Sequence, residues 1–164
     1  MKNLFLLRHA KSSWDNAALG DFDRPLSKRG ISNAIQLSEY IQKHSISFDL
    51  VLSSPSERTQ STLDLVLNSF DPIPKTSLKD SIYHASPSNL SQLIKELDDE
   101  INNLLIIGHN PGLHILTEIL TNESIVKFPT CAFAKFTNFN HWKDIDAGIL
   151  NLESLITPKA LKHD

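Results

Sequence analysis

The chain has 164 residues, of which 40% are hydrophobic, which is enough to fill the core of one domain. Its formal net charge of −3 is close to neutral for this length, so we expect neither a nucleic acid nor a membrane as partner. The single cysteine, Cys131, excludes an internal disulfide and a site built from several thiolates, and it is expected to be a small core residue.

The N-terminal part predicts a strand followed by a long loop. Residues 4–7 form an unbroken apolar run, which is typical of a strand buried on both faces of a sheet. The run is too short for a signal peptide or a membrane span, so we expect a cytoplasmic protein. His9 follows this strand directly. Residues 10–25 are polar and predict a long loop, and long loops in compact domains usually have a function.

Two helices are predicted on either side of a second buried strand, at residues 48–52. Ser27 can cap the first helix, and Ser54 with Pro55 gives a start signal for the second, which places Arg58 in its first turn. The apolar face of the first helix is predicted to contain Ile31, Ala34, Ile35, Ser38 and Ile41. That of the second is predicted to contain Leu63, Val66, Leu67 and Phe70.

The rest of the chain continues the alternation of helices and strands. Ser86 and Pro87 predict a third helix start, followed by a stripe of Leu90, Leu93, Ile94, Leu97 and Ile101. A third buried strand is predicted at residues 104–107, a helix at 113–120, and further strands at 133–137 and 149–155. The tail from residue 158 is expected to be loose.

This order of elements predicts an α/β fold. We expect a single-domain, three-layer sandwich over residues 1–157, with a largely parallel central sheet and helices on both faces, followed by a tail at 158–164. In such sheets ligands bind at the carboxyl ends of the strands. The ends of three predicted strands therefore mark the candidate site.

Four side chains with suitable chemistry follow these strand ends, namely Arg8, His9, Arg58 and His109. Arginine offers planar, bidentate donors to a phosphoryl group, and a neutral imidazole nitrogen can attack phosphorus. A second imidazole can hold an oxygen as charge redistributes in the transition state. Because positioning and charge stabilisation supply nearly all the catalysis of phosphoryl transfer, these residues predict a phosphoryl-transfer pocket.

The motifs that contain these residues resemble the histidine phosphatase superfamily, and within it the short branch related to the phosphohistidine phosphatase SixA. They are Leu7-Arg8-His9-Ala10-Lys11-Ser12-Ser13-Trp14, Asp23-Arg24-Pro25-Leu26-Ser27-Lys28-Arg29-Gly30, Ser53-Ser54-Pro55-Ser56-Glu57-Arg58-Thr59-Gln60-Ser61-Thr62 and Gly108-His109-Asn110-Pro111. The resemblance implies a phosphoglycerate mutase-like fold and a phosphorylated His9 intermediate. It also implies that Arg8, Arg58 and His109 hold the phosphate, without a metal or another cofactor. Ser12 and Asn110 are further candidates for substrate contacts.

The sequence departs from the family pattern where the larger members have a glutamate general acid. Residues 80–85 contain no glutamate, and Asp23, Asp15, Asp21 and His84 are the candidate substitutes, with Asp23 ranked first. A positioned general acid is worth on the order of 10²–10⁴ in rate. Its absence favours substrates whose leaving groups need little protonation, and the imidazole of phosphohistidine is such a group.

The leading hypothesis is therefore a phosphatase that acts on phosphohistidine in a protein, or on another activated phosphomonoester. One alternative is a small-molecule phosphomonoesterase or a phosphoglycerate-type mutase, although a mutase needs a site closed to water. A second alternative is a phosphate-binding module without turnover, which would keep both arginines and have no need for His9. The partner is thus expected to be a phosphorylated protein or a small phosphorylated substrate.

Overall fold

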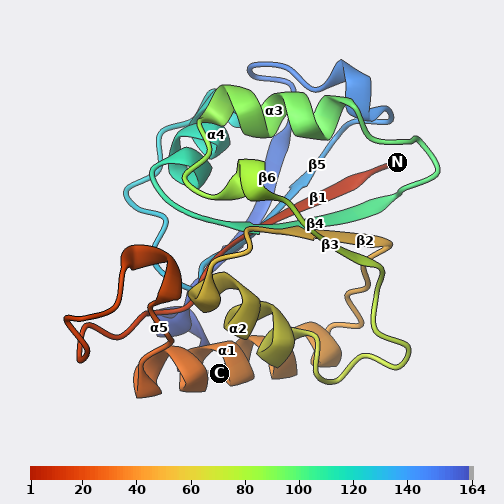
Figure 1. Ribbon diagram of the computed structural model, residues 1–164. Coiled ribbons are helices and arrows are strands. Elements are labelled where there is room, and N and C mark those ends of the chain that lie inside the picture. The colour runs from red at the N-terminus through yellow and green to blue at the C-terminus, as the bar shows by residue number, and fades with distance from the viewer. Residues whose placement is uncertain (163–164) are drawn as a thin grey trace.

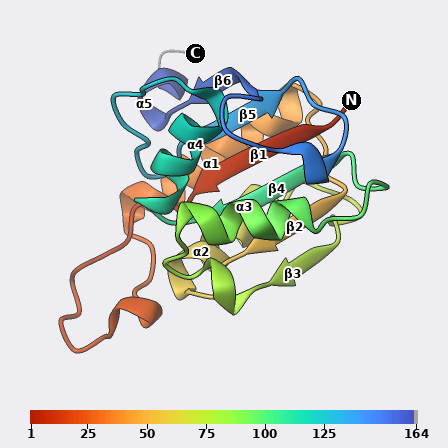
Figure 2. The ribbon, with the colours of Figure 1, turned by 90° about the horizontal axis from the view of Figure 1, so that it is seen from above.

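A computed structural model describes residues 1–162 and has one six-stranded sheet with the strand order β3-β2-β4-β1-β5-β6 (Figures 1 and 2). The strands are β1 (Asn3–Arg8), β2 (Leu50–Ser53), β3 (Thr76–Leu78), β4 (Asn103–Gly108), β5 (Phe133–Thr137) and β6 (Asn151–Ile156). The first four strands pair in parallel, as β1 with β4, β4 with β2, and β2 with β3. β5 runs antiparallel to both of its neighbours, β1 and β6. The predicted α/β fold with a largely parallel sheet is confirmed.

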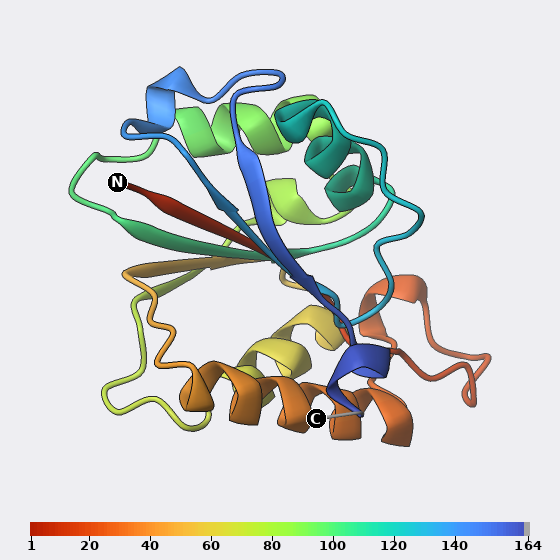
Figure 3. The ribbon, with the colours of Figure 1, turned by 180° about the vertical axis from the view of Figure 1, so that it is seen from behind.

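Helices cover both faces of the sheet, as predicted. They are α1 (Lys28–Lys43), α2 (Glu57–Val66), α3 (Pro87–Lys95), α4 (Gly112–Thr121) and α5 (Pro158–Leu161), with short 3-10 turns η1 (Asp21–Asp23), η2 (Asp80–Ile82) and η3 (Trp142–Asp144). Figures 1 and 3 show α3 and α4 on one face, and α1, α2 and α5 on the other. None of the helices within residues 1–162 combines the length and apolar character needed to cross a membrane.

The sheet separates two apolar cores, and the alternation of side chains along β1 explains why. Leu4 and Leu6 belong to the core beneath α3 and α4, while Phe5 and Leu7 belong to the core over α1 and α2. Successive side chains of a strand point to opposite faces, so a strand with a helix layer on each side must be apolar throughout. This is why the uninterrupted apolar runs of the sequence predict the central strands.

Several expected details differ at the edges of these elements. β3 was not expected, because it is three residues long, lies at the edge of the sheet and is mostly exposed. Residues Pro158–Leu161 form α5, where the sequence predicts a loose tail, because Thr157 caps this turn and Leu161 packs against the core over α1. Residues 163–164 of that tail lie outside the described residues.

The helix starts are partly as predicted. Ser27 and Ser86 cap α1 and α3, accepting hydrogen bonds from the backbone N–H of Gly30 and Asn89. The predicted cap of α2 is wrong, since this helix begins at Glu57 after Ser56, and Ser54 is freed for another contact.

The predicted buried faces need two corrections. On α1, Ile31 and Ile35 are 41% and 43% exposed, because the helix turns Asn33 and Leu37 toward the protein instead. α3 ends at Lys95, so the last two residues of its predicted stripe, Leu97 and Ile101, lie beyond the helix. Both are partly buried and pack against the core.

Candidate active site

The carboxyl ends of β1, β2 and β4 lie side by side and deliver the predicted site residues to one edge of the sheet. Arg8 pairs with Gly108 in the β1–β4 register, so His9 and His109 follow adjacent strand ends. A cavity of about 250 Å³ opens at this edge. It is lined by Arg8, His9, Lys11, Ser12, Trp14, Arg24, Arg58, His84, His109, Asn110 and Thr130. The structure thus brings together the four residues that the sequence singled out.

His9 is held in one tautomer by its own backbone. It is 7% exposed, and its Nδ1 lies 2.8 Å from the carbonyl oxygen of Ala10, which can only accept a hydrogen bond. Nδ1 therefore carries the proton of the neutral ring, and Nε2 keeps its lone pair. Burial lowers the pKa of His9 to about 4, and the charges of Arg58 and Arg8 add to this effect, so the ring is neutral at pH 7.

The loop that holds His9 is anchored to α2. The backbone N–H of Ala10 donates to the hydroxyl oxygen of Thr62 at 2.9 Å, and this hydroxyl donates to the carbonyl of Arg58 at 2.7 Å. On the other side, the N–H of Cys131 donates to the carbonyl of His9. The Ala10 carbonyl that orients the imidazole is therefore fixed from two elements.

His109 has the opposite tautomer. The guanidinium of Arg58 lies 3.3 Å from Nδ1 of His109 and can only donate, so Nδ1 accepts. Nε2 then carries the proton and donates to the hydroxyl of the fully buried Ser54 at 2.8 Å. Burial, and next the charge on His9, lower the pKa of His109 to about 3. The two imidazole centroids are 5.2 Å apart.

Arg8 has a donor with no partner. Its Nη1 donates to the carbonyl of Phe128 at 3.2 Å, and the side-chain amide of Asn110 donates to the same oxygen at 2.7 Å. The Nε of Arg8 is buried and has no hydrogen-bond partner within residues 1–162. Burial, followed by the nearby Arg58, lowers the pKa of Arg8. Because unpaired buried donors are rare, this group marks a place for an anionic ligand.

Of the candidate acids, the structure places Asp21 and His84 at the site. The carboxylate of Asp21 accepts hydrogen bonds from Tyr83 at 2.6 Å, Arg58 at 3.0 Å and His84 at 3.1 Å. The Tyr83 hydroxyl, and next the Arg58 guanidinium, hold the pKa of Asp21 well below its usual range. Asp21 is therefore ionised here, and its carboxylate takes up a hydrogen-bond donor of the Arg58 guanidinium.

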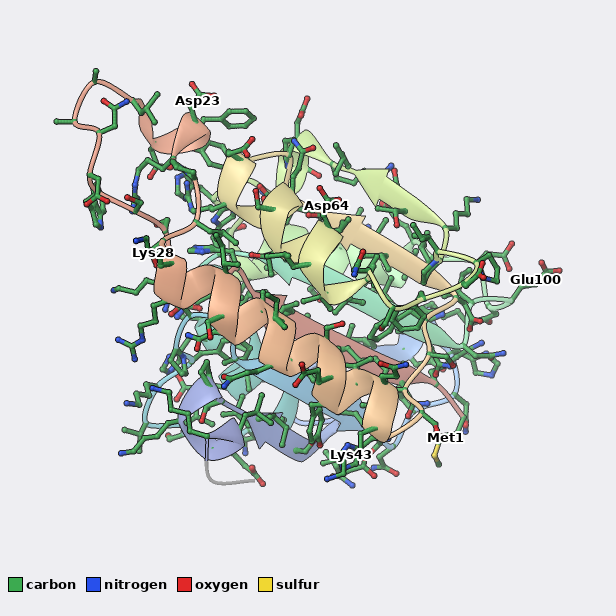
Figure 4. All side chains as sticks on the ribbon, turned by 90° about the horizontal axis from the view of Figure 1, so that it is seen from below. Met1, Asp23, Lys28, Lys43, Asp64 and Glu100 are labelled. Atoms are coloured by element: carbon green, nitrogen blue, oxygen red, sulfur yellow. The ribbon has the colours of Figure 1, made fainter. Side chains whose placement is uncertain are left out.

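The other two candidates, Asp23 and Asp15, are exposed. Within the described part of the chain, none of the three aspartates belongs to the cavity lining, but Asp21 contacts Arg58, which does. Figure 4 shows Asp23 on the loop that projects beyond the body of the protein. Of the three aspartates, the structure thus places Asp21, and not the first-ranked Asp23, in contact with Arg58.

Arg24 organises the rim of the cavity. It is 8% exposed, and its guanidinium donates to the hydroxyl of Ser12, to the carbonyl of Ser13 and to the carboxylate of Asp21. It also lies 3.2 Å from the centroid of the Trp14 ring, a cation–π contact. Trp14 itself is 76% exposed.

Sequence reasoning missed the site roles of Ser54, Thr62, Tyr83 and Arg24. Three of them are ordinary helix or loop residues by pattern, and only their contacts with His109, Ala10 and Asp21 distinguish them. Ser54, Thr62 and Arg24 fall inside the family motifs, and Arg24 carried a further signal as a third arginine close in sequence to the predicted pocket.

Comparisons with known proteins agree with this geometry. Residues 4–81 match the model of the histidine phosphatase superfamily, branch 1. An uncharacterized chloroplastic protein of Arabidopsis thaliana is 32% identical, with 96% of this chain and 78% of that protein covered.

Two solved SixA structures share the fold. One is described as a phosphohistidine phosphatase SixA from Agrobacterium tumefaciens, with a TM-score of 0.84, 24% identity and coverage of 96% of this chain and 98% of that one. The other is the protein histidine phosphatase SixA with tungstate, with a TM-score of 0.83, 22% identity and coverage of 97% and 99%. Family and fold together support enzymatic phosphoryl chemistry of the phosphatase or mutase type. The chain belongs to the histidine phosphatase superfamily.

Proposed function

We propose that this protein is a phosphatase that removes the phosphoryl group from phosphohistidine in a protein, through a phosphorylated His9. The observation that carries the proposal is the tautomer of His9. With Nδ1 donating to the Ala10 carbonyl, Nε2 is an unprotonated nucleophile at neutral pH, inside a cavity lined by three arginines.

The surrounding groups support binding of a phosphoryl group next to His9. The unpaired Nε of Arg8 and the guanidinium of Arg58 provide donors for its oxygens, and Asp21 must yield its bonds to Arg58 for the second contact to form. His109 contributes to the same wall, with its ring fixed by Ser54. These donors would stabilise the charge that spreads over the equatorial oxygens in the transition state.

The reaction then has two balanced steps. The lone pair of His9 Nε2 forms a bond to phosphorus while the bond from phosphorus to the substrate's imidazole nitrogen breaks. With a proton already on the other nitrogen of that ring, the imidazole leaves as a neutral molecule with the electron pair. A water molecule next attacks phosphorus, the bond to Nε2 breaks, and inorganic phosphate is released. Because the Asp21 carboxyl is ionised, it offers no proton to the first step. This supports substrates with good leaving groups over alkyl phosphates.

The proposal is tested first by trapping the intermediate. Brief incubation with a radiolabelled phosphohistidine peptide should leave acid-labile, base-stable label on the wild type and none on His9→Ala. Equal labelling of both proteins would exclude His9 as nucleophile. A phosphate-binding module would take up no covalent label, and a mutase would return the label to a second position of its substrate instead of releasing phosphate.

A substrate panel tests the leaving-group argument. Phosphohistidine and activated aryl phosphates should be hydrolysed at least about 100-fold faster than phosphoserine or glycerol phosphate, which is the lower end of what a general acid contributes. Similar kcat/KM values across the panel would mean that the site protonates the leaving group after all, and would remove the reason for preferring phosphohistidine.

A further inference from the structure

A second pocket, of about 220 Å³, lies beside the candidate active site, where α1, α5 and the segment before β5 meet (Figure 3). Four cationic residues line it together with Asn33 and Thr130; the cations are Arg29, Lys127, Lys159 and Lys162. We call this pocket the basic groove.

The charge of the basic groove is local and unbalanced. The chain as a whole is slightly acidic, with a net charge of −3, yet the residues among 1–162 that line this pocket include no carboxylate. As far as the structure describes the chain, none of the four cations forms a salt bridge, whereas Lys135 on β5 pairs with Glu153 at 2.7 Å. Like charges gathered in one hollow repel each other, so an anion bound there would be stabilised.

The floor of the groove offers a hydrogen-bond donor as well. Asn33 lines the groove and is 4% exposed. The N–H₂ group of Asn33 can donate to a carboxylate oxygen that enters between the cations.

The basic groove borders the cavity of the candidate active site. Thr130 lines both, and the carbonyl of Phe128, two residues earlier, holds Arg8 and Asn110 at the active site. An extended polypeptide advances about 3.3 Å per residue, so residues that flank a phosphohistidine at His9 would reach a neighbouring hollow within a few positions. A free phosphate ion is too small to occupy both places at once.

We propose that the basic groove binds acidic side chains that flank the phosphohistidine of the substrate protein, and so selects substrates with an acidic surface around the modified residue. This inference rests on the proposed function. It adds a docking site outside the residues that handle the phosphoryl group.

Two matched phosphohistidine peptides test the groove, one with glutamates on both sides of the phosphohistidine and one with glutamines. The wild type should hydrolyse the glutamate peptide with a kcat/KM about 10-fold higher, since a few surface ion pairs at 0.2–1 kcal/mol each amount to roughly this factor. The difference should lie in KM and shrink at high salt. The triple variant Lys127→Gln, Lys159→Gln, Lys162→Gln should lose the preference while its turnover of p-nitrophenyl phosphate stays unchanged.

The control variant removes the same charge elsewhere, through Lys43→Gln, Lys75→Gln and Lys143→Gln. All three lysines are exposed, and Figure 4 shows Lys43 at the end of α1 opposite Lys28. This control should keep the preference for the glutamate peptide. Equal loss in both triple variants, equal rates of the wild type on both peptides, or a loss of p-nitrophenyl phosphatase activity in the groove variant would overturn the docking site.

Failure of the proposed function would look different, because the wild type would then release phosphate from neither peptide. Binding to the His9→Ala protein, followed by fluorescence anisotropy, tests the groove without turnover. The glutamate peptide should bind about 10-fold more tightly than the glutamine peptide, and the groove triple variant in this background should remove the difference. Equal affinities would overturn the groove even if catalysis were absent.

Discussion

At the scale of single residues, two neighbouring histidines differ because their hydrogen-bond partners differ. His9 faces a carbonyl that can only accept, whereas His109 faces a guanidinium that can only donate. One ring therefore keeps Nε2 free and the other keeps Nε2 protonated toward Ser54. The proposed division into nucleophile and supporting imidazole follows from these partners, which lie inside the sequence motifs although the motifs do not show which ring nitrogen each partner contacts.

The tautomer and pKa of His9 can be measured directly. ¹⁵N NMR of the free protein should show the proton on Nδ1 of His9 and a single titration near pH 4, because the buried ring resists protonation. Phosphorylation of His9 by an aryl phosphate should accordingly stay constant from pH 8 to 5 as far as this residue is concerned, and fall as the pH drops through about 4. A midpoint near 6.5 or an Nε2–H tautomer would contradict this account.

Asp21 competes with phosphate for Arg58. Its carboxylate accepts from the guanidinium at 3.0 Å, so a phosphate must displace it or bind beside its negative charge. Asp21→Asn should therefore bind inorganic phosphate more tightly, by about 1 kcal/mol or roughly fivefold, measured by titration calorimetry at low salt. Asp23→Asn, which removes the same charge from the exposed part of the same 3-10 turn, should have little effect. Equal effects of the two variants would refute a specific role of Asp21.

The site was predictable where a residue directly follows a buried strand. Arg8, His9 and His109 come at or one residue past the ends of β1 and β4, so the sheet alone fixes where they lie. Asp21 could not be preferred over Asp23 from sequence. The two residues lie two positions apart on the same loop, and only the path of the backbone distinguishes them. It turns Asp21 toward Arg58 and leaves Asp23 on the projecting part of the loop.

At the scale of elements, the apolar pattern predicted strands better than helix faces. A strand buried on both sides needs only an apolar run, and β1 and β4 have one. The rotation of α1 depends on what packs beside it. Its contacts with α2, α5 and the sheet bury Asn33 and leave Ile31 exposed, although apolarity alone predicts the reverse.

The junction between the long loop and α1 depends on a glycine. A Cβ at Gly30 would lie 2.1 Å from the carbonyl oxygen of Lys11, the same oxygen that accepts from the backbone N–H of Ser27. Gly30→Ala should therefore displace the loop, lower the free energy of unfolding by at least about 1 kcal/mol and reduce kcat, although alanine is the better helix former. Urea unfolding and phosphatase assays would measure both effects.

Gly20 is the matched control, because a Cβ there meets nothing within 4 Å. Gly20→Ala should leave stability and activity within error of the wild type. If Gly30→Ala behaved like Gly20→Ala, the loop and helix would have to be more adaptable than this backbone contact allows.

At the scale of the whole molecule, the cavity of the candidate active site is the place where polar side chains are buried inside the layered fold. Apolar cores cover the strands on both faces of the sheet. At the strand ends, by contrast, the buried side chains are polar: Ser54, Arg58 and His109 are each at most 4% exposed. Each needs an internal partner: Arg58 donates to Nδ1 of His109, and Nε2 of His109 donates to the hydroxyl of Ser54. The arrangement favours a site preorganised for an anion over maximum stability.

This arrangement predicts how stability depends on pH. The folded pKa values of His9 and His109 are about 4 and about 3, whereas an unfolded histidine titrates near 6.5. Between these values the unfolded chain binds protons that the folded chain does not, so the free energy of unfolding falls as the pH drops below about 6.5. Each histidine should contribute a loss on the order of 2 kcal/mol between pH 7 and pH 5.

Urea unfolding followed by circular dichroism at pH 7, 6 and 5 measures this loss. The window lies above the titration of Asp21, whose lowered pKa makes its contribution to stability disappear only at more acidic pH. His9→Gln should remove about half of the pH dependence whatever it does to stability at pH 7, because a glutamine cannot take up the proton in either state. A wild type that is equally stable at pH 5 and pH 7 would mean that the two imidazoles are protonated in the folded protein, and His9 could then not act as a neutral nucleophile.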